Sequence, residues 1–224
     1  MSSRFVVLRP EPGASATADH IRAMGRQALT VPLFHAVPQS WDGPDPAGID
    51  AVMFTSANGA RLAGPELARY RHLPAYAVGE ATAGAVRASG FLRVEAGNTD
   101  ATALAKHMAL AGHCTILHMA GRDVRPFDAA GLQIARRIVY AMDPTQDGAM
   151  LPDRLESGDC LLVHSPRAGA RLAALIPRLA RKRFHLAAIS PAALQACDEG
   201  WQKASAASQP TDTALLALAA GLCD

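Results

Sequence analysis

Small polar residues stand where short apolar segments of this sequence end. They are Thr55, Ser56 and Asn58 after AVMF, Gly79 and Thr82 after AYAV, Gly121 and Arg122 beyond TILHM, and Ser165 after LLVH. If these apolar runs are parallel strands, the residues gather at the carboxyl edge of a sheet, where open α/β folds bind ligands. Helix N-termini at that edge present free N–H groups and a positive dipole end, which suit a carboxylate or a phosphate.

Helix capping is the alternative role for each of these residues, because Ser, Thr and Asn are common N-caps. Convergence of four such turns on one edge favours a cleft that binds several anionic groups. Metal chemistry has little support, since the eight histidines are scattered and neither HxxxH nor a Cys/His cluster has ligand spacing. G-x-S-x-G, Walker and G-x-G-x-x-G motifs are absent from the sequence, which disfavours serine hydrolases and nucleotide or dinucleotide enzymes.

The elements that must position these residues alternate between strand and helix. The expected strands are Phe5–Leu8, Leu29–Val37, AVMFT, AYAVG, LRVEA, TILHM, ARRIVYAM and LLVHS, and the expected helices span about 14–24, 59–70, 80–89, 100–111, 124–133 and 211–222, with a further helix after LLVHS. Regular alternation predicts parallel sheets covered by helices on both faces. Pro32 makes Leu29–Val37 an edge or connecting strand.

Two helices carry distinct patterns. The last one is apolar nearly all round, which predicts burial. The helix after LLVHS sets apolar and cationic stripes on opposite faces, and the cationic stripe is expected to be solvated. The apolar stripe is Leu172, Leu175, Ile176 and Leu179, and the cationic stripe is Arg167, Arg171, Arg178 and Lys182.

An internal repeat relates the two halves of the chain. DAVMFTSANGARLA begins at Asp50, and DCLLVHSPRAGARLA begins 109 residues later at Asp159. Further on, AVGEATAGAV matches AISPAALQAC, and TDATALA matches TDTALLA. So long a period is unlike a solenoid and indicates two related halves. Chance similarity in an Ala-rich chain is the alternative.

Bulk composition sets broad limits. Of 224 residues, 50% are hydrophobic and 19% charged, so a packed core is expected rather than disorder. A net charge of +2 is too small to predict nucleic-acid binding but suits an anionic small molecule. The four cysteines lack CxxC spacing, and neither a signal peptide nor a membrane-length apolar run is evident. These features predict a cytoplasmic protein with unpaired thiols.

The ordered set of motifs resembles the uroporphyrinogen-III synthase family. The motifs are S-x-N at Ser56, V-G-x-x-T-A at Val78, G-R-x-x-R at Gly121, I-V-Y ending at Tyr140, S-P at Ser165 and P-T-x-T-A-L-L at Pro210. The resemblance extends from LRPEPGA near the start to the last helix. Each motif is weakly specific, whereas their order and spacing together are informative.

The resemblance implies two flavodoxin-like, doubly wound parallel-sheet lobes joined by a two-stranded connector. In this arrangement the first strand-helix unit pairs with the C-terminal half. One lobe is expected to combine residues 1–34 with 142–224, and the other to comprise residues 35–141. Two Pro/Gly-rich crossings, 38–48 and 143–158, fit that layout.

The resemblance also implies a hydro-lyase that cyclises hydroxymethylbilane to uroporphyrinogen III, with loss of water and inversion of ring D through a spiro intermediate. No cofactor or metal is implied, and a monomer without membrane or nucleic-acid partners is expected. Tyr140 matches the family's functional tyrosine; because a phenol is a weak acid at neutral pH, we expect a hydrogen-bond donor to the leaving oxygen. Ring packing at the lobe junction is the alternative. The expected substrate-binding residues are Arg9, Thr55, Ser56, Asn58, Gly79, Thr82, Gly121, Arg122 and Ser165.

One turn departs from the family pattern. Where relatives carry G-x-T-T, this chain has Ser190, Pro191, Ala192 and Ala193, so the other lobe is expected to carry more of the binding. A non-catalytic two-lobed protein that binds or senses tetrapyrroles or other anions is the alternative function. A nucleotide- or sugar-using enzyme on a doubly wound fold is disfavoured by the missing phosphate loops.

Overall fold

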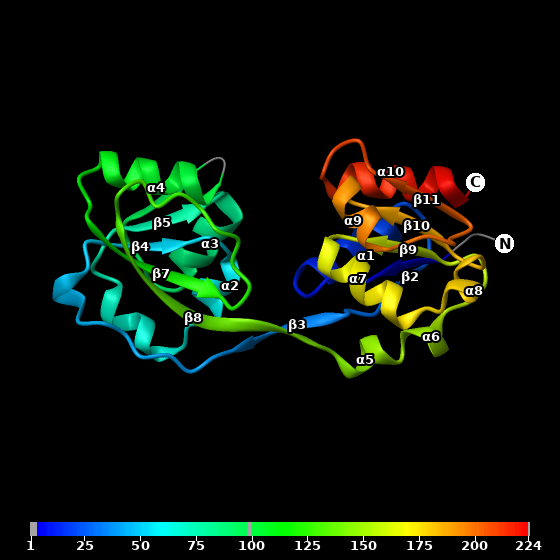
Figure 1. Ribbon diagram of the computed structural model, residues 1–224, viewed down its shortest axis with the longest axis horizontal. Helices are drawn as coiled ribbons and strands as arrows, with labels where there is room; N and C mark the ends of the chain where they lie inside the picture. Colours follow the sequence, from blue (N-terminus) through cyan, green and yellow to red (C-terminus); the bar gives the residue numbers. More distant parts are fainter. Residues whose placement is uncertain (1–3, 98–99, 224) are drawn as a thin grey trace. The chain divides into compact units, whose positions relative to one another are not determined.

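The computed structural model describes residues 4–97 and 100–223, which divide into two compact units (Figure 1). Unit 1 runs up to His35 and resumes at Asp143, whereas unit 2 is Ala36–Met142. The chain therefore passes between the units twice, within strands β3 (Phe34–Pro38) and β8 (Gln133–Pro144).

Unit 1 is built on a five-stranded parallel sheet in the order β11-β10-β9-β1-β2. The strands are β1 (Phe5–Val7), β2 (Ala28–Thr30), β9 (Cys160–Val163), β10 (His185–Ala188) and β11 (Lys203–Ala206). Every residue of β1, β9 and β10 is buried, as expected of strands covered on both faces. Because β1 lies between β9 and β2, the N-terminal strand joins the C-terminal ones, as the resemblance implies.

Helices cover both faces of the unit 1 sheet. Phe5, Val7 and Leu162 belong to the cluster formed with α1 (Gly13–Ala23) and α10 (Asp212–Cys223). Alternate strand residues face the other way, where α7 (Pro166–Leu175) and α9 (Pro191–Ala196) pack together. Three short helices complete the unit: α5 (Gln146–Ala149), α6 (Leu151–Arg154) and α8 (Arg178–Arg181).

Unit 2 contains a six-stranded sheet in the order β3-β8-β7-β4-β5-β6. Its other strands are β4 (Ala51–Phe54), β5 (Ala75–Val78), β6 (Val94–Gly97) and β7 (Thr115–Gly121). The pairs from β8 through β6 are all parallel. Val52, Phe54 and Leu117 pack against α2 (Ala57–Arg61), the 3₁₀ segment Pro65–Tyr70 and α3 (Glu80–Ala88). Met53 and Ile116 pack against α4 (Ala101–Leu110) on the opposite face, and a short 3₁₀ turn spans Pro46–Gly48.

The two sheets share one strand order. The series β11-β10-β9-β1-β2 of unit 1 corresponds to β6-β5-β4-β7-β8 of unit 2. In each unit the central strand, β1 or β7, comes from the opposite half of the sequence. The repeat read from the sequence therefore has a counterpart in the topology.

The helix predicted over residues 124–133 is wrong. Residues 122–130 are irregular, a turn spans Ala130 and Gly131, and β8 begins at Gln133. Pro126 interrupts the segment, and the Asp128 carboxylate accepts the Ala130 N–H at 2.9 Å, an Asx turn that competes with a helix. Ala130 and Gly131 then have positive φ angles of 52° and 83°, which end any helical course.

Two other predicted segments are divided. Residues 59–70 are not one helix, because Gly64 has a φ of +72° and Pro65 follows, so α2 stops at Arg61 and a 3₁₀ segment takes over. Leu29–Val37 splits around Pro32 into β2 and β3, each at the edge of its sheet, as the proline predicts.

The helix predicted after LLVHS ends earlier than its stripes suggest. The chain leaves α7 at Leu175 and resumes as α8 after Pro177, so Leu179 is 86% exposed instead of lying on a buried stripe. On the cationic side Arg178 and Lys182 are exposed, but Arg171 is half-buried.

The final helix is also less buried than predicted. In α10, Leu215, Leu216 and Ala219 are buried, whereas Ala217 and Gly221 are exposed. The helix therefore packs by one face, and small residues rather than polar ones lie on the other.

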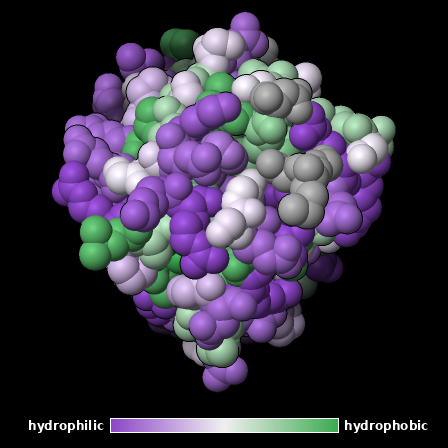
Figure 2. Space-filling view, turned by 90° about the vertical axis from the view of Figure 1, so that its right-hand side faces the viewer, coloured by the Kyte–Doolittle hydropathy of each residue, from purple (hydrophilic) through white to green (hydrophobic). Residues whose placement is uncertain are grey.

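The surface gives no sign of a membrane span. Among the helices of residues 4–97 and 100–223, none has the length and apolarity needed to cross a bilayer. The face drawn in Figure 2 is mostly hydrophilic, with scattered apolar residues. None of the four cysteines forms a disulfide, which confirms the expectation of free thiols.

Candidate functional site

A cleft of about 490 Å³ opens at the carboxyl edge of the unit 2 sheet. Its lining residues are Thr55, Ser56, Val78, Asp100, Ala101, Thr102, Tyr140 and the segment 123–127. They come from the ends of β4 and β5, the start of α4, the loop after β7 and the middle of β8. This is the edge at which a parallel α/β sheet is expected to bind ligands.

Thr55 and Ser56 bring hydroxyl groups to this cleft directly after β4. The Ser56 hydroxyl accepts the Asn58 N–H at 3.3 Å and so caps α2. Thr55 Oγ1 lies 3.1 Å from Nε2 of His118, which stands on the neighbouring strand β7. Capping and cleft lining are thus combined in Ser56, and both roles considered for it remain compatible.

His118 is fully buried behind the cleft. Its ring meets Phe127 edge-on, with ring centroids 5.5 Å apart. Burial, reinforced by the positive charge of Arg136, lowers the pKa of His118 to about 4. The imidazole is therefore neutral at physiological pH. A polar residue inside the apolar run TILHM was the signal that could have identified it.

Tyr140 lies against a glycine. A Cβ atom added to Gly121 would lie 2.6 Å from Cζ of the Tyr140 ring, so a side chain there would displace the ring. The two residues are paired across β7 and β8, next to a register shift. Within residues 4–97 and 100–223 the Tyr140 hydroxyl makes no hydrogen bond, and its ring lines the cleft. Gly121 thus fixes the position of the tyrosine.

Four other predicted residues lie near this edge without lining the cleft. Asn58 contributes its N–H to the α2 cap, and Gly79 takes a φ of +76° before α3. Thr82 is buried in α3, with 7% of its surface exposed. Arg122 donates its backbone N–H to the Tyr140 carbonyl at 2.9 Å and its Nη2 to Gln39 Oε1 at 2.7 Å.

Charged and aromatic residues that the sequence did not single out complete the cleft. Asp100 caps α4 by accepting the Ala103 N–H at 2.9 Å, and Asp123 and Arg125 lie on the loop after β7. Phe127 contributes an apolar wall. Arg125 and Phe127 also line a second hollow of about 530 Å³, together with His118, Arg136 and Arg137. The same loop therefore separates a mixed polar cleft from a cationic hollow.

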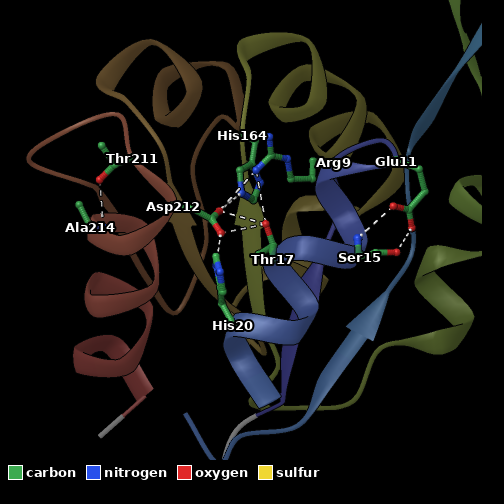
Figure 3. Close-up of polar contacts among 9 residues, drawn as sticks. All are labelled: Arg9, Glu11, Ser15, Thr17, His20, His164, Thr211, Asp212 and Ala214. Carbon is green, nitrogen blue, oxygen red and sulfur yellow. Dashed lines mark hydrogen bonds and ion pairs between the residues drawn. The ribbon is translucent and has the colours of Figure 1, made fainter. Parts of the chain in front are cut away.

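The corresponding edge of unit 1 is internally neutralised (Figure 3). At its centre the Asp212 carboxylate accepts hydrogen bonds from Thr17 Oγ1 at 3.0 Å and lies 3.0 Å from His164 Nε2. Arg9 Nη1 lies 3.5 Å from the same carboxylate, and His20 Nδ1 lies 3.4 Å from it. We call these five residues the Asp212 cluster. The predicted binding residue Arg9 is thus already paired with an internal anion.

Burial and hydrogen bonding oppose each other within the Asp212 cluster. Burial raises the pKa of Asp212, but hydrogen bonds from His164 and Thr17 outweigh it and hold the pKa below its ordinary value. For His164, burial lowers the pKa despite the contact with Asp212. The carboxylate is therefore charged and the buried imidazole neutral at physiological pH.

The remaining predicted residue of unit 1 is a cap. Ser165 accepts the Ala168 N–H at 3.2 Å at the start of α7, and Ser190 does the same for Ala193 at 3.3 Å in α9. Ala193 is fully buried, and its carbonyl oxygen lies only 2.7 Å from the position of a Cβ added to Gly169. Close packing of α7 on α9 therefore occupies the turn where relatives carry threonines.

The unit 2 cleft has the chemistry of a binding site for a polar, partly aromatic ligand. Hydroxyl donors, an Arg, two Asp and an apolar wall meet around one volume, so both anionic groups and N–H donors can be accommodated. Among the residues that the structure describes, no group of three or more His, Cys, Asp or Glu could hold a metal ion.

Comparison with known proteins supplies the family context. A profile of the family "Uroporphyrinogen-III synthase HemD" matches residues 15–217. No curated protein matches the chain significantly. Among solved structures, the uroporphyrinogen-III synthetase of Helicobacter pylori 26695 is similar, with a TM-score of 0.68 and 18% identity over 99% of this chain and 100% of that one. Uroporphyrinogen III synthase of the extremely thermophilic bacterium Thermus thermophilus gives TM-scores of 0.43 and 0.48 for two crystal forms, at 16% and 13% identity and 97% coverage of both chains.

Proposed function

The chain belongs to the uroporphyrinogen-III synthase family and is a lyase of tetrapyrrole biosynthesis, and we propose that the unit 2 cleft binds its linear tetrapyrrole substrate. That substrate, hydroxymethylbilane, is a flexible chain of four pyrroles bearing carboxylate side chains. Thr55, Ser56 and Arg125 provide groups for carboxylates, while Asp100 and Asp123 are acceptors suited to pyrrole N–H groups. The unit 1 edge is a weaker candidate because the Asp212 cluster already satisfies its cation.

Positioning is the main task of the protein in this reaction. Loss of the terminal hydroxyl as water gives an azafulvene, driven by the electron pair of the pyrrole nitrogen. Its attack on the substituted carbon of ring D forms the spiro intermediate, and fragmentation with reclosure inverts that ring. Holding the chain so that this carbon is reachable replaces an improbable encounter by an intramolecular one.

Tyr140 is our candidate for the group that assists departure of the hydroxyl. The observation that carries this proposal is its placement: the ring is seated on Gly121 and lines the cleft, with a hydroxyl that bonds to no described residue. A hydrogen bond from the phenol to the leaving oxygen strengthens as that oxygen gains negative charge. Thr55 and Ser56 line the same cleft and are proposed to hold the substrate.

We further propose that the two units act as the two lobes of a monomeric, cytoplasmic enzyme. Four thiols without disulfides suit a reducing compartment. The large apolar side chains exposed among the described residues lie apart along the chain: Met24, Leu92, Leu110, Ile138, Met150 and Leu179. Light scattering during size-exclusion chromatography tests the monomer, which has a mass of 23.4 kDa.

Separation of the isomeric products tests the function. The purified protein is supplied with hydroxymethylbilane, and the oxidised products are resolved by chromatography. We expect type III product well above the amount formed without protein. Type I product alone, at the rate of spontaneous closure, would contradict the enzyme and favour a protein that only binds tetrapyrroles.

A further inference from the structure

We propose that His118 is a positioning residue, which donates its Nε2–H to Thr55 Oγ1 and thereby turns the Thr55 hydroxyl proton into the cleft. The inference rests on the proposed function, because it assigns the donor that meets a substrate carboxylate. His118 does not line that cleft itself and acts through Thr55, whose Oγ1 lies 3.1 Å from Nε2.

The unpaired ring nitrogen identifies the tautomer. Nδ1 of His118 is buried and has no hydrogen-bond partner among the described residues. A neutral imidazole carries one N–H, and a buried N–H without an acceptor is rarer than a buried acceptor without a donor. The proton therefore belongs on Nε2, where Thr55 Oγ1 can accept it. Nδ1 is left with a lone pair rather than an unsatisfied hydrogen.

Donation from His118 determines what Thr55 can do. A hydroxyl has one proton and two acceptor lone pairs, so Oγ1 can accept from the imidazole and still donate its own proton. Thr55 lines the cleft, and its proton is thus available to an acceptor there. A carboxylate is such an acceptor. If the imidazole instead accepted from Thr55, the hydroxyl would present a lone pair and repel a carboxylate.

The surroundings keep His118 in this state. Phe127 covers the ring edge-on, and the paired position on β8 is Arg136, whose charge opposes protonation. Burial has the larger effect and holds the pKa of the imidazole at about 4. The ring accordingly remains neutral, with a fixed tautomer, over the physiological pH range. Thr55 thus keeps a defined donor direction.

Nitrogen NMR of the histidine ring tests the tautomer without reference to activity. In protein labelled with ¹⁵N, long-range correlations distinguish a protonated ring nitrogen from an unprotonated one. We expect His118 to show protonated Nε2 and unprotonated Nδ1, unchanged between about pH 8 and pH 5. Protonated Nδ1, or two protonated nitrogens at neutral pH, would overturn the proposal.

Two amide substitutions separate positioning from simple packing. The side-chain nitrogen of His118→Gln reaches about as far as Nε2, whereas that of His118→Asn reaches about as far as Nδ1. For hydroxymethylbilane, we expect the KM of His118→Asn to rise about 5- to 20-fold with little change in kcat, and that of His118→Gln to stay within about threefold. Equal KM values for both variants would contradict the role of Nε2, whether they equal the wild-type value or not.

A double-mutant cycle tests whether His118 acts through Thr55. Thr55→Val removes the hydroxyl and nearly preserves the shape of the side chain. In the Thr55→Val background, His118→Asn should change KM by less than about twofold, because the group it positions is already gone. Multiplication of the two single effects would show independent roles. If His118→Asn does not fold, Thr55→Val alone decides: an unchanged KM would overturn the proposal.

The outcomes distinguish this inference from the proposed function. If the wild-type protein does not convert hydroxymethylbilane to the type III product, the proposed function fails, whatever the tautomer. If the wild type is active but the Asn and Gln variants behave alike, the positioning role alone fails. Calorimetric binding of uroporphyrinogen III under anaerobic conditions repeats the comparison without turnover, and the same order of affinities is expected.

Discussion

The carboxyl edges of the two sheets have the same strand order but opposite electrostatic states. In unit 1 the edge is held together by Asp212, which contacts Thr17, His164 and Arg9. The repeat aligns Asp212 with Asp100 of unit 2, which caps α4 and lines an open cleft. One aspartate thus neutralises its edge, and the other lies beside a binding volume.

The segment after the central strand explains the difference. In unit 1, β1 is followed by helix α1, which delivers Thr17 to the edge. In unit 2, β7 is followed by an irregular loop that contains Pro126 and contributes residues 123–127 to the cleft. Related sheets can therefore use the same edge for stability in one unit and for binding in the other. Substitutions in the two units should separate these uses.

Tyr140→Phe should have the largest effect, and it falls on unit 2. Loss of the hydroxyl removes one positioned donor, so kcat should fall about 10- to 1,000-fold while KM changes less. Substrate released unconverted closes to the type I isomer, so the isomer ratio gives a second readout. As a control, Tyr70→Phe removes a hydroxyl that bonds the Pro44 carbonyl away from the cleft, and kcat should be retained. Wild-type turnover of Tyr140→Phe would leave the tyrosine with a packing role.

Acid should destabilise the fold through the buried imidazole of unit 2. The folded-state pKa of His118 is about 4 and its ordinary value is 6.5, so between these values the unfolded chain binds the extra proton. The contribution is complete above about pH 6.5 and is lost as the pH falls toward 4, at most about 3 kcal/mol. Urea unfolding across this range should give a flatter profile for His118→Gln. His35→Gln, at an exposed site, should follow the wild type; parallel profiles for all three proteins would refute the assignment.

Asp212→Ala should separate stability from binding in unit 1. Removing the carboxylate leaves His164 and Thr17 without their partner, which should cost about 2 kcal/mol of unfolding free energy. KM for hydroxymethylbilane should change little in protein that remains folded. Asp19→Ala removes an exposed partner of Arg22 and should cost less than about 0.5 kcal/mol. A large rise in KM without loss of stability would place substrate at the unit 1 edge.

The two serine caps offer the smallest and best-matched comparison. Ser56 caps α2 and Ser165 caps α7, so replacing either by Ala should cost about 1 kcal/mol. Because Ser56 also lines the cleft, its substitution should raise KM about 3- to 10-fold, whereas Ser165→Ala should leave KM within about twofold. Equal effects on KM would mean that the two edges are functionally alike.

Sequence patterns were sufficient where the determinant is local. Apolar runs located the strands, Pro32 marked the division between two edge strands, and the repeat pointed to two related sheets. The pairing of β1 with β9 was not accessible from periodicity, since it joins residues more than 150 positions apart, and it came from the family resemblance. The convergence of Thr55 and Ser56 followed from strand ends meeting at one edge.

Contacts between elements escaped the sequence. His118 meets Thr55 because β4 and β7 are adjacent in a particular register, and a histidine in an apolar run does not state its partner. The Asp212 cluster joins side chains from both ends of the chain, so Arg9 was read as free to bind substrate. The loop after β7 was read as a helix because the Asx turn at Asp128 depends on backbone geometry that composition does not reveal.

Mapping the bound product by NMR tests the central claim most directly. Uroporphyrinogen III is titrated anaerobically into ¹⁵N-labelled protein, and amide shifts are followed in both units. We predict that the large changes fall on Thr55, Ser56 and the segment 123–127, with Ser165 and Ser190 nearly unaffected. Changes concentrated at Arg9, Ser165 and Ser190, with the unit 2 cleft silent, would contradict the assignment of binding to unit 2.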